Sequence, residues 1–143
     1  MEPLKHRNVL LVLLLAVLAA PVASAGPGWA TRCSDLGTGA CATALLTPTL
    51  LGCAATATGS RCDVLWTLDV SVTAPTCAWA YSLPTDQVLV CAPVLPATGA
   101  VWGVASYDVP AGGATATEEG RVCVDYGVFT RCAAFTASID LPA

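Results

Sequence analysis

The sequence predicts one all-β domain, an antiparallel β-sandwich of immunoglobulin-like or barrel-like form that is held by disulfides. Three observations support this prediction: strict apolar–polar alternation in two long segments, turn signals between short apolar runs, and eight cysteines that all follow an apolar leader. About seven or eight short strands separated by such turns are typical of sandwiches and barrels. After the leader, no segment has a helical period.

The first 25 residues have the pattern of a secretory signal peptide. A basic start (5–7) precedes an apolar run (9–20) and small residues at Ala23 and Ala25. This apolar run is short for a membrane span, which takes about 20 residues. We therefore expect cleavage after Ala25, which would leave residues 26–143 as one secreted, extracellular domain with no membrane attachment.

The clearest strand signal runs from Cys62 to Thr73, and the last segment repeats it. In the first, one face carries Cys62, Val64, Trp66, Leu68, Val70 and Val72, and the other carries Asp63, Thr67, Asp69, Ser71 and Thr73. In the last, one face carries Phe129, Ala133, Phe135, Ala137, Ile139 and Leu141, with Arg131 as an interruption. A period of two residues predicts half-buried antiparallel strands.

Shorter apolar runs and the turn signals between them complete the expected sheet. The strand candidates are 40–46, 49–57, 77–82, 88–92, 100–109 and 121–125. The turn signals are Gly37 and Gly39, Thr47-Pro48, Gly59-Ser60, Ala74-Pro75, 84–86, 96–99 and 110–113.

The cysteine spacing favours bridges between sequence neighbours. These pairs would be Cys33–Cys41, Cys53–Cys62, Cys77–Cys91 and Cys123–Cys132, and their midpoints fall at or near Gly37, Gly59, Pro84 and Gly127. Each pair would then join two strands close to a turn. The alternative is that some bridges join the two sheets of the sandwich, because spacing alone does not fix connectivity.

The composition after the leader excludes several kinds of chemistry. The only His, Lys, Asn and Met of the chain all lie within the first 25 residues. His-dependent hydrolysis, His-ligated zinc, Schiff-base lysines and N-glycosylation are therefore excluded from the mature domain, and no cysteines form a C-x-x-C pair. Four arginines against nine acidic residues leave a net charge of −5, which argues against binding nucleic acid or an anionic membrane. We expect no cofactor and no metal.

Carboxylates and tryptophans are the remaining functional candidates. A paired-carboxylate glycosidase could draw on Asp63, Asp69, Asp86, Asp108, Glu118, Glu119, Asp125 and Asp140, but nothing in the sequence singles out a pair. We interpret Asp63 and Asp69 as solvated residues that prevent aggregation at the edge of a sheet. Glu118 and Glu119 fall in a Gly- and Thr-rich stretch that we expect to be a mobile loop, too poor in oxygen ligands for calcium.

Four tryptophans are many for so small a domain. Alternation places Trp66 with Leu and Val and places Trp79 with Cys77 and Tyr81, so we expect both in the core. We expect Trp29 and Trp102 to be exposed, where aromatic rings stack on sugars or line a ligand cleft.

The segment from Cys77 to Pro93 carries the patterns C-A-W and V-L-x-C-x-P. In these it resembles the disulfide hairpin of the neocarzinostatin-like apoproteins, which are small secreted immunoglobulin-like sandwiches that carry an apolar chromophore. Two further cysteine pairs toward the N-terminus and a wider last pair depart from that family. We therefore transfer no ligand or site residue.

These observations predict a secreted, non-catalytic domain that acts by surface recognition of an extracellular protein or small ligand, or as an exported structural protein. One form of recognition is protease inhibition by a loop such as 83–87, braced by Cys77 and Cys91. Two alternatives remain. A small apolar-ligand carrier would need a cavity between the sheets, and a glycoside hydrolase would need two carboxylates that converge in a groove.

Overall fold

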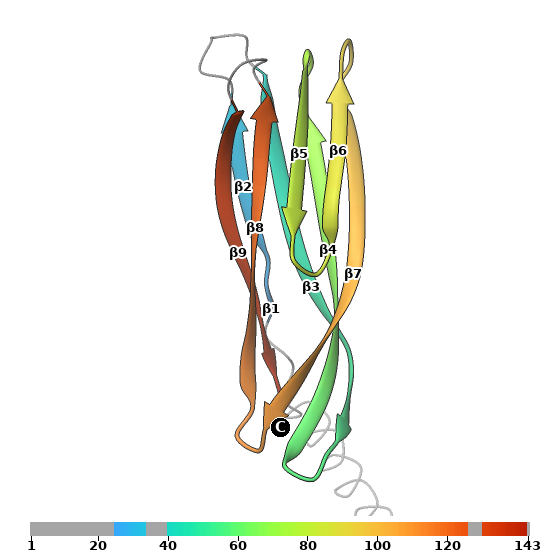
Figure 1. Cartoon of the computed structure of the whole chain (residues 1–143), viewed down its shortest axis with the longest axis vertical. Helices are drawn as coiled ribbons and strands as arrows, with labels where there is room; N and C mark the ends of the chain where they lie inside the picture. The colour runs from blue at the N-terminus through green and yellow to red at the C-terminus, as the bar shows by residue number, and fades with distance from the viewer. Residues whose placement is uncertain (1–24, 34–39, 126–129, 143) are drawn as a thin grey trace, which may run out of the picture.

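The computed structural model describes residues 25–33, 40–125 and 130–142 as nine strands and no helix (Figure 1). The strands are β1 (Ala25–Gly26), β2 (Gly28–Cys33), β3 (Cys41–Ala55), β4 (Gly59–Val72), β5 (Thr76–Ser82), β6 (Asp86–Ala92), β7 (Ala97–Pro110), β8 (Ala114–Asp125) and β9 (Thr130–Leu141). The leader up to residue 24, the turn signals at Gly37, Gly39 and Gly127, and Phe129 lie outside the described residues. Ala25 and Gly26 pair with β9, so the expected cleavage point falls within β1.

The strands form two antiparallel sheets, which confirms the predicted all-β sandwich. One sheet has the order β1-β9-β8-β5-β6 and the other the order β2-β3-β4-β7. All strands run along the long axis of the molecule, and the β5–β6 hairpin ends about halfway along it (Figure 1). Within the part of the chain that the structure describes, no helix is long and apolar enough to cross a membrane.

Alternating residues of both sheets fill the space between them. Trp66 of β4 is fully buried, and it belongs to one core cluster with Leu46, Leu68 and Ile139. The faces predicted for the Cys62–Thr73 segment and for 133–141 are confirmed, since the apolar side of each strand points inward. Burial of this apolar surface is the main force that holds the two sheets together.

A turn was expected at Thr47-Pro48, and this expectation is wrong, because β3 continues through both residues. The pairing of β3 with β2 ends at Leu46, so from Pro48 onward β3 has a hydrogen-bonded neighbour only on its β4 side. Proline lacks an N–H donor and is tolerated in a strand where no partner needs that donor. Pro48 is accordingly buried opposite Trp66.

The four disulfides join sequence neighbours, as the cysteine spacing favoured. Cys33–Cys41, Cys53–Cys62, Cys77–Cys91 and Cys123–Cys132 each link directly opposed residues of adjacent antiparallel strands, with Cα–Cα distances of 4.0 to 4.1 Å. None of them joins one sheet to the other. No cysteine among the described residues is free.

A β-bulge between Leu50 and Gly52 is what allows the second disulfide to form. Leu50 pairs with Val64, but after the bulge Cys53 pairs with Cys62. In an unbroken register Arg61 would have been opposite Cys53. The extra residue, Leu51, is pushed outward, and Cys53 turns toward the face that carries Cys62.

The stretch that contains Glu118 and Glu119 is a strand, not the mobile loop that we expected. β8 begins at Ala114, after the turn formed by residues 110–113, and pairs with β9 along its whole length. Ala116 points into the core, whereas Thr115 and Thr117 face outward, so this part does alternate. The inward residues are small, so the two-residue period of a strand is hard to recognise in the sequence. β2 was not predicted either, because the alternation of Gly28 and Ala30 with Trp29 covers too few residues to indicate a strand.

The tip of the β5–β6 hairpin packs directly against β7. A Cβ added to Gly103 of β7 would lie 1.7 Å from the carbonyl oxygen of Pro84, which is in the predicted 84–86 turn. At the tip, Thr85 is buried and its hydroxyl shares a hydrogen bond with that of Ser82. The hairpin therefore ends against the other sheet instead of projecting into solvent.

Candidate functional site

The carboxylates considered for glycoside hydrolysis are spread over the molecule. Asp63 accepts a hydrogen bond from Ser106, Asp108 lies 3.7 Å from Arg61, and Asp140 accepts a hydrogen bond of 2.8 Å from Thr115. Asp69 faces outward on β4, and Asp125 ends β8. β4 is a central strand, so the expectation that Asp63 and Asp69 guard a sheet edge is wrong, although both are exposed as predicted.

Glu118 lies on the inner side of β8 and takes part in a hydrogen-bonded chain between the sheets. Trp66 Nε1 donates to the Tyr107 hydroxyl at 3.0 Å, and that hydroxyl donates to Glu118 Oε1 at 2.7 Å. Burial raises the pKa of the Tyr107 hydroxyl well above its ordinary value, and the hydrogen bond to Glu118 raises it further. The chain gives the indole N–H of the buried Trp66 a partner, so its role is structural.

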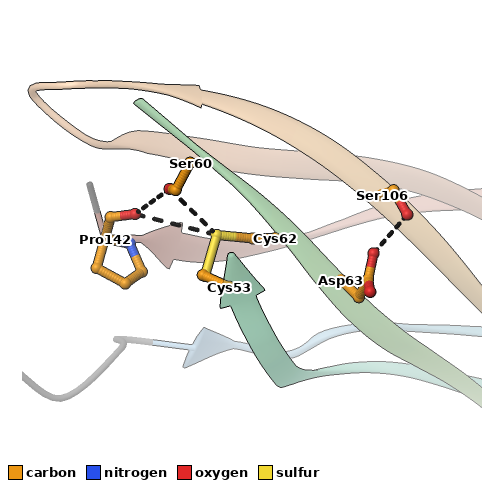
Figure 2. The surroundings of a disulfide bond; sticks show 6 residues. All are labelled: Cys53, Ser60, Cys62, Asp63, Ser106 and Pro142. Atoms are coloured by element: carbon orange, nitrogen blue, oxygen red, sulfur yellow. Dashed lines mark hydrogen bonds between the residues drawn. A yellow bond between two sulfur atoms is a disulfide. The ribbon is translucent and has the colours of Figure 1, made fainter. Parts of the chain in front are cut away.

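Ser60, beside the Cys53–Cys62 disulfide, binds the backbone of Pro142 (Figure 2). The hydroxyl of Ser60 donates a hydrogen bond of 3.2 Å to the carbonyl oxygen of Pro142 and lies 3.7 Å from Cys62 Sγ. Ser60 and Cys62 are both buried. Both sulfurs are in a disulfide, and the buried Ser60 hydroxyl is engaged with Pro142, so we assign this cluster a structural role.

A first groove, of about 480 Å³, lies beside the hairpin tip. We call it the tip groove; its lining residues are Tyr81, Ser82, Leu83, Asp86, Gln87, Glu119, Gly120 and Arg121. It brings two of the candidate carboxylates, Asp86 and Glu119, to one surface with a tyrosine and an arginine. Leu83 is 94% exposed at its rim, within the loop considered for protease inhibition.

The outer face of the β2-β3-β4-β7 sheet carries the two exposed tryptophans. Trp29 is 67% exposed and Trp102 is 69% exposed, which confirms the expectation for both. Trp29 opposes Leu45, Leu45 opposes Asp69, and Asp69 opposes Ala100, so these four residues form one row across the sheet. Directly opposed residues of antiparallel strands have their side chains on the same face of the sheet. Trp102 follows two residues after Ala100 and therefore shares this face.

A second groove, of about 490 Å³, lies on the same face, beside the row that begins at Trp29, and neither tryptophan lines it. Its outward lining combines hydroxyls, one carboxylate and apolar atoms from Thr43, Leu45, Asp69, Ser71, Thr98 and Ala100. Thr31 belongs to the next row, and its hydroxyl shares a hydrogen bond of 2.8 Å with that of Thr43. We call this surface the tryptophan face and define it as Trp29, Thr31, Thr43, Leu45, Thr67, Asp69, Ser71, Thr98, Ala100 and Trp102.

Trp79 was expected in the core, and this expectation is wrong. The alternation with Cys77 and Tyr81 holds, but all three point outward, while Ala78 and Ala80 occupy the inner side and are fully buried. The core is filled from the opposite sheet by Trp66, so small residues suffice on β5. Trp79 is half-buried on the outer face, where it opposes Cys123, a residue that is itself buried.

Trp29, Trp102 and Asp69 are each visible as candidates in the sequence, but only the strand order shows that they lie on one face. Tyr107 was not among the candidates from the sequence, although its inward position follows from the alternation of β7. The described residues hold no cluster of three or more His, Cys, Asp or Glu side chains that could bind a metal ion. Comparison with known proteins returns no family model, no curated protein and no solved structure with a significant match to this chain.

Proposed function

We propose that residues 26–143 form a secreted, non-catalytic binding domain that recognises its partner through the tryptophan face. Four disulfides are consistent with an extracellular location, because such bonds persist in oxidising compartments. The leader and the absence of His and Lys from these residues support export and a function other than catalysis.

The single observation that carries the proposal is the exposure of two tryptophans on one face of a sheet, with a groove beside them. Trp29 and Trp102 leave more apolar surface in water than any fold requirement explains, since neither contributes to the core cluster. Tryptophan is enriched at binding hot spots because a large rigid ring buries much area at a low cost in conformational entropy. A rigid, disulfide-braced sheet also presents such rings in a fixed arrangement.

The test is a capture experiment with matched baits. The oxidised mature domain, the double variant Trp29→Ala/Trp102→Ala and the control Leu89→Ala would be immobilised and exposed to culture medium and cell-envelope material of the source. Leu89 is also an exposed apolar residue, but it lies on the other sheet. We expect a component that the wild type and the control retain and the double variant loses. Retention by all three baits would rule out the tryptophan face as the site.

A glycoside hydrolase that acts at the tip groove is the second candidate. It rests on the presence of Asp86 and Glu119 in one groove with Tyr81 and Arg121. Two carboxylates that flank a glycosidic bond provide the general acid and the base or nucleophile of such enzymes. Turnover of a polysaccharide by the wild type that disappears in Asp86→Asn or Glu119→Gln, with the fold intact, would favour this function over recognition.

A further inference from the structure

We propose that the ligand of the tryptophan face is a neutral polysaccharide chain, which binds across the sheet from Trp29 to Trp102. This inference rests on the proposed function and names the partner of the same surface. Its support comes from three properties of the face: the spacing of the rings, the polar groups of the groove beside them and the small number of charges.

The two rings are spaced for an extended ligand. Trp29 and Ala100 lie three strands apart in one row, and Trp102 lies two residues further along β7. With strands about 4.8 Å apart and a rise of about 3.4 Å per residue, the Cα atoms of the two tryptophans are separated by roughly 16 Å. This span is too long for one sugar ring and fits a short run of linked rings.

The chemistry of the tryptophans and of the groove beside them suits a sugar. A pyranose presents C–H groups on its flat faces, and these favour the negative face of an indole ring. Its hydroxyls both donate and accept hydrogen bonds. The groove offers Thr43, Ser71 and Thr98 as donors and acceptors and the Asp69 carboxylate as a strong acceptor.

The charge of the face selects a neutral ligand. Asp69 is the only ionisable side chain among the residues that define the tryptophan face. Further along the same face, Asp63 accepts a hydrogen bond from Ser106, and Arg61 and Asp108 form an ion pair of 3.7 Å. A polyanion would meet Asp69 on a protein that is already net negative, and a polycation would find a single carboxylate. An uncharged, hydroxyl-rich chain meets neither obstacle.

The experiment measures binding of the oxidised mature domain to defined polysaccharides. Depletion onto insoluble cellulose and chitin would be combined with affinity electrophoresis in soluble β-glucan, mannan and starch, with pectate as the anionic comparison. The variants are Trp29→Ala/Trp102→Ala, Asp69→Ala and the control Leu89→Ala. All four sites are exposed, so thermal unfolding should show that each variant is folded.

We expect retention by at least one neutral polysaccharide and none by pectate. The double variant should bind at least about ten-fold more weakly, which corresponds to ~1.4 kcal/mol. Asp69→Ala should also weaken binding, which simple adsorption of apolar surface would not produce, and Leu89→Ala should bind as the wild type does.

Three results would overturn the inference. The first is the absence of binding to every neutral polysaccharide, and the second is binding that the double variant retains. The third is a concentration-dependent dimer that the double variant abolishes, because a second copy of the chain would then cover the face. If the matched baits still capture a component that only the double variant loses, the recognition function stands and only the identity of its partner is wrong.

Discussion

Replacing Gly103 with alanine should destabilise the domain by forcing the hairpin tip away from β7. The new Cβ would lie 1.7 Å from the Pro84 carbonyl oxygen and 2.8 Å from the Pro84 carbonyl carbon, whereas ordinary contact begins at 3.4 Å. Both contacts are with backbone, so no side-chain rotation relieves them. The tip would have to move by about 1.7 Å, which would disturb the packing of the buried Thr85.

Overpacking of this kind costs typically about 1–3 kcal/mol, and a backbone clash lies at the upper end. The reduced entropy of the unfolded chain returns about 0.4–1 kcal/mol when glycine becomes alanine. We therefore expect Gly103→Ala to lower the free energy of unfolding by about 2 kcal/mol.

The assay is urea and thermal unfolding of the oxidised protein, followed by tryptophan fluorescence. The matched control is Gly52→Ala, another strand glycine, whose added Cβ would meet nothing within 4 Å. We expect this control to be neutral or slightly stabilising. If both variants have a free energy of unfolding within about 0.5 kcal/mol of that of the wild type, the hairpin tip does not pack on β7.

Three further predictions follow from the core and the disulfides. Tyr107→Phe leaves Trp66 Nε1 and Glu118 without their partner and should cost about 1–2 kcal/mol in urea unfolding, whereas Ser106→Ala, on the exposed face of the same strand, should cost less than about 0.5 kcal/mol. Because the pKa of Tyr107 is raised in the folded state, the unfolded chain loses that proton first. Wild-type stability should therefore fall from about pH 10 upward more steeply than that of Tyr107→Phe, and parallel pH profiles would contradict this. Alkylation without reduction should modify no cysteine, and peptide mapping should recover four neighbour bridges, including Cys123–Cys132. A bridge between the sheets would contradict the pairing.

Much of the fold could be predicted from alternation and spacing. The Cys62–Thr73 segment alternates over its whole length with large apolar residues, so its strand conformation and its buried face were both predicted correctly. The turn predicted at Pro48 was wrong because a proline usually interrupts a strand. Only the register shows that β2 has ended by that point, so no neighbour needs an N–H from Pro48. The loop predicted around Glu118 was wrong because the inward residues of this segment are small. Without bulky apolar side chains, the alternation of a strand is difficult to recognise.

The candidate site was less predictable, because it depends on which strands become neighbours. Trp29 and Trp102 are 73 residues apart in sequence and meet only through the order β2-β3-β4-β7. Alternation shows that residues share a face but does not say which face is inside, and this is why Trp79 was misplaced. The proposed role of Asp69 in binding depends on the cross-strand row that joins it to Trp29 through Leu45, and the sequence does not show this row.

Binding of a neutral polysaccharide at the tryptophan face can be observed by nuclear magnetic resonance of the four tryptophan indole N–H groups. Each indole gives its own signal, and the four rings differ in environment: Trp66 is buried and bonded to Tyr107, Trp79 is half-buried on the other sheet, and two lie on the tryptophan face. During titration with neutral oligosaccharides, we predict that the Trp29 and Trp102 signals shift together with one affinity while those of Trp66 and Trp79 stay in place. If the backbone amides of Tyr81 and Arg121 in the tip groove shifted saturably in the same titration while the Trp29 and Trp102 indole signals did not change, the tryptophan face would not be the binding surface.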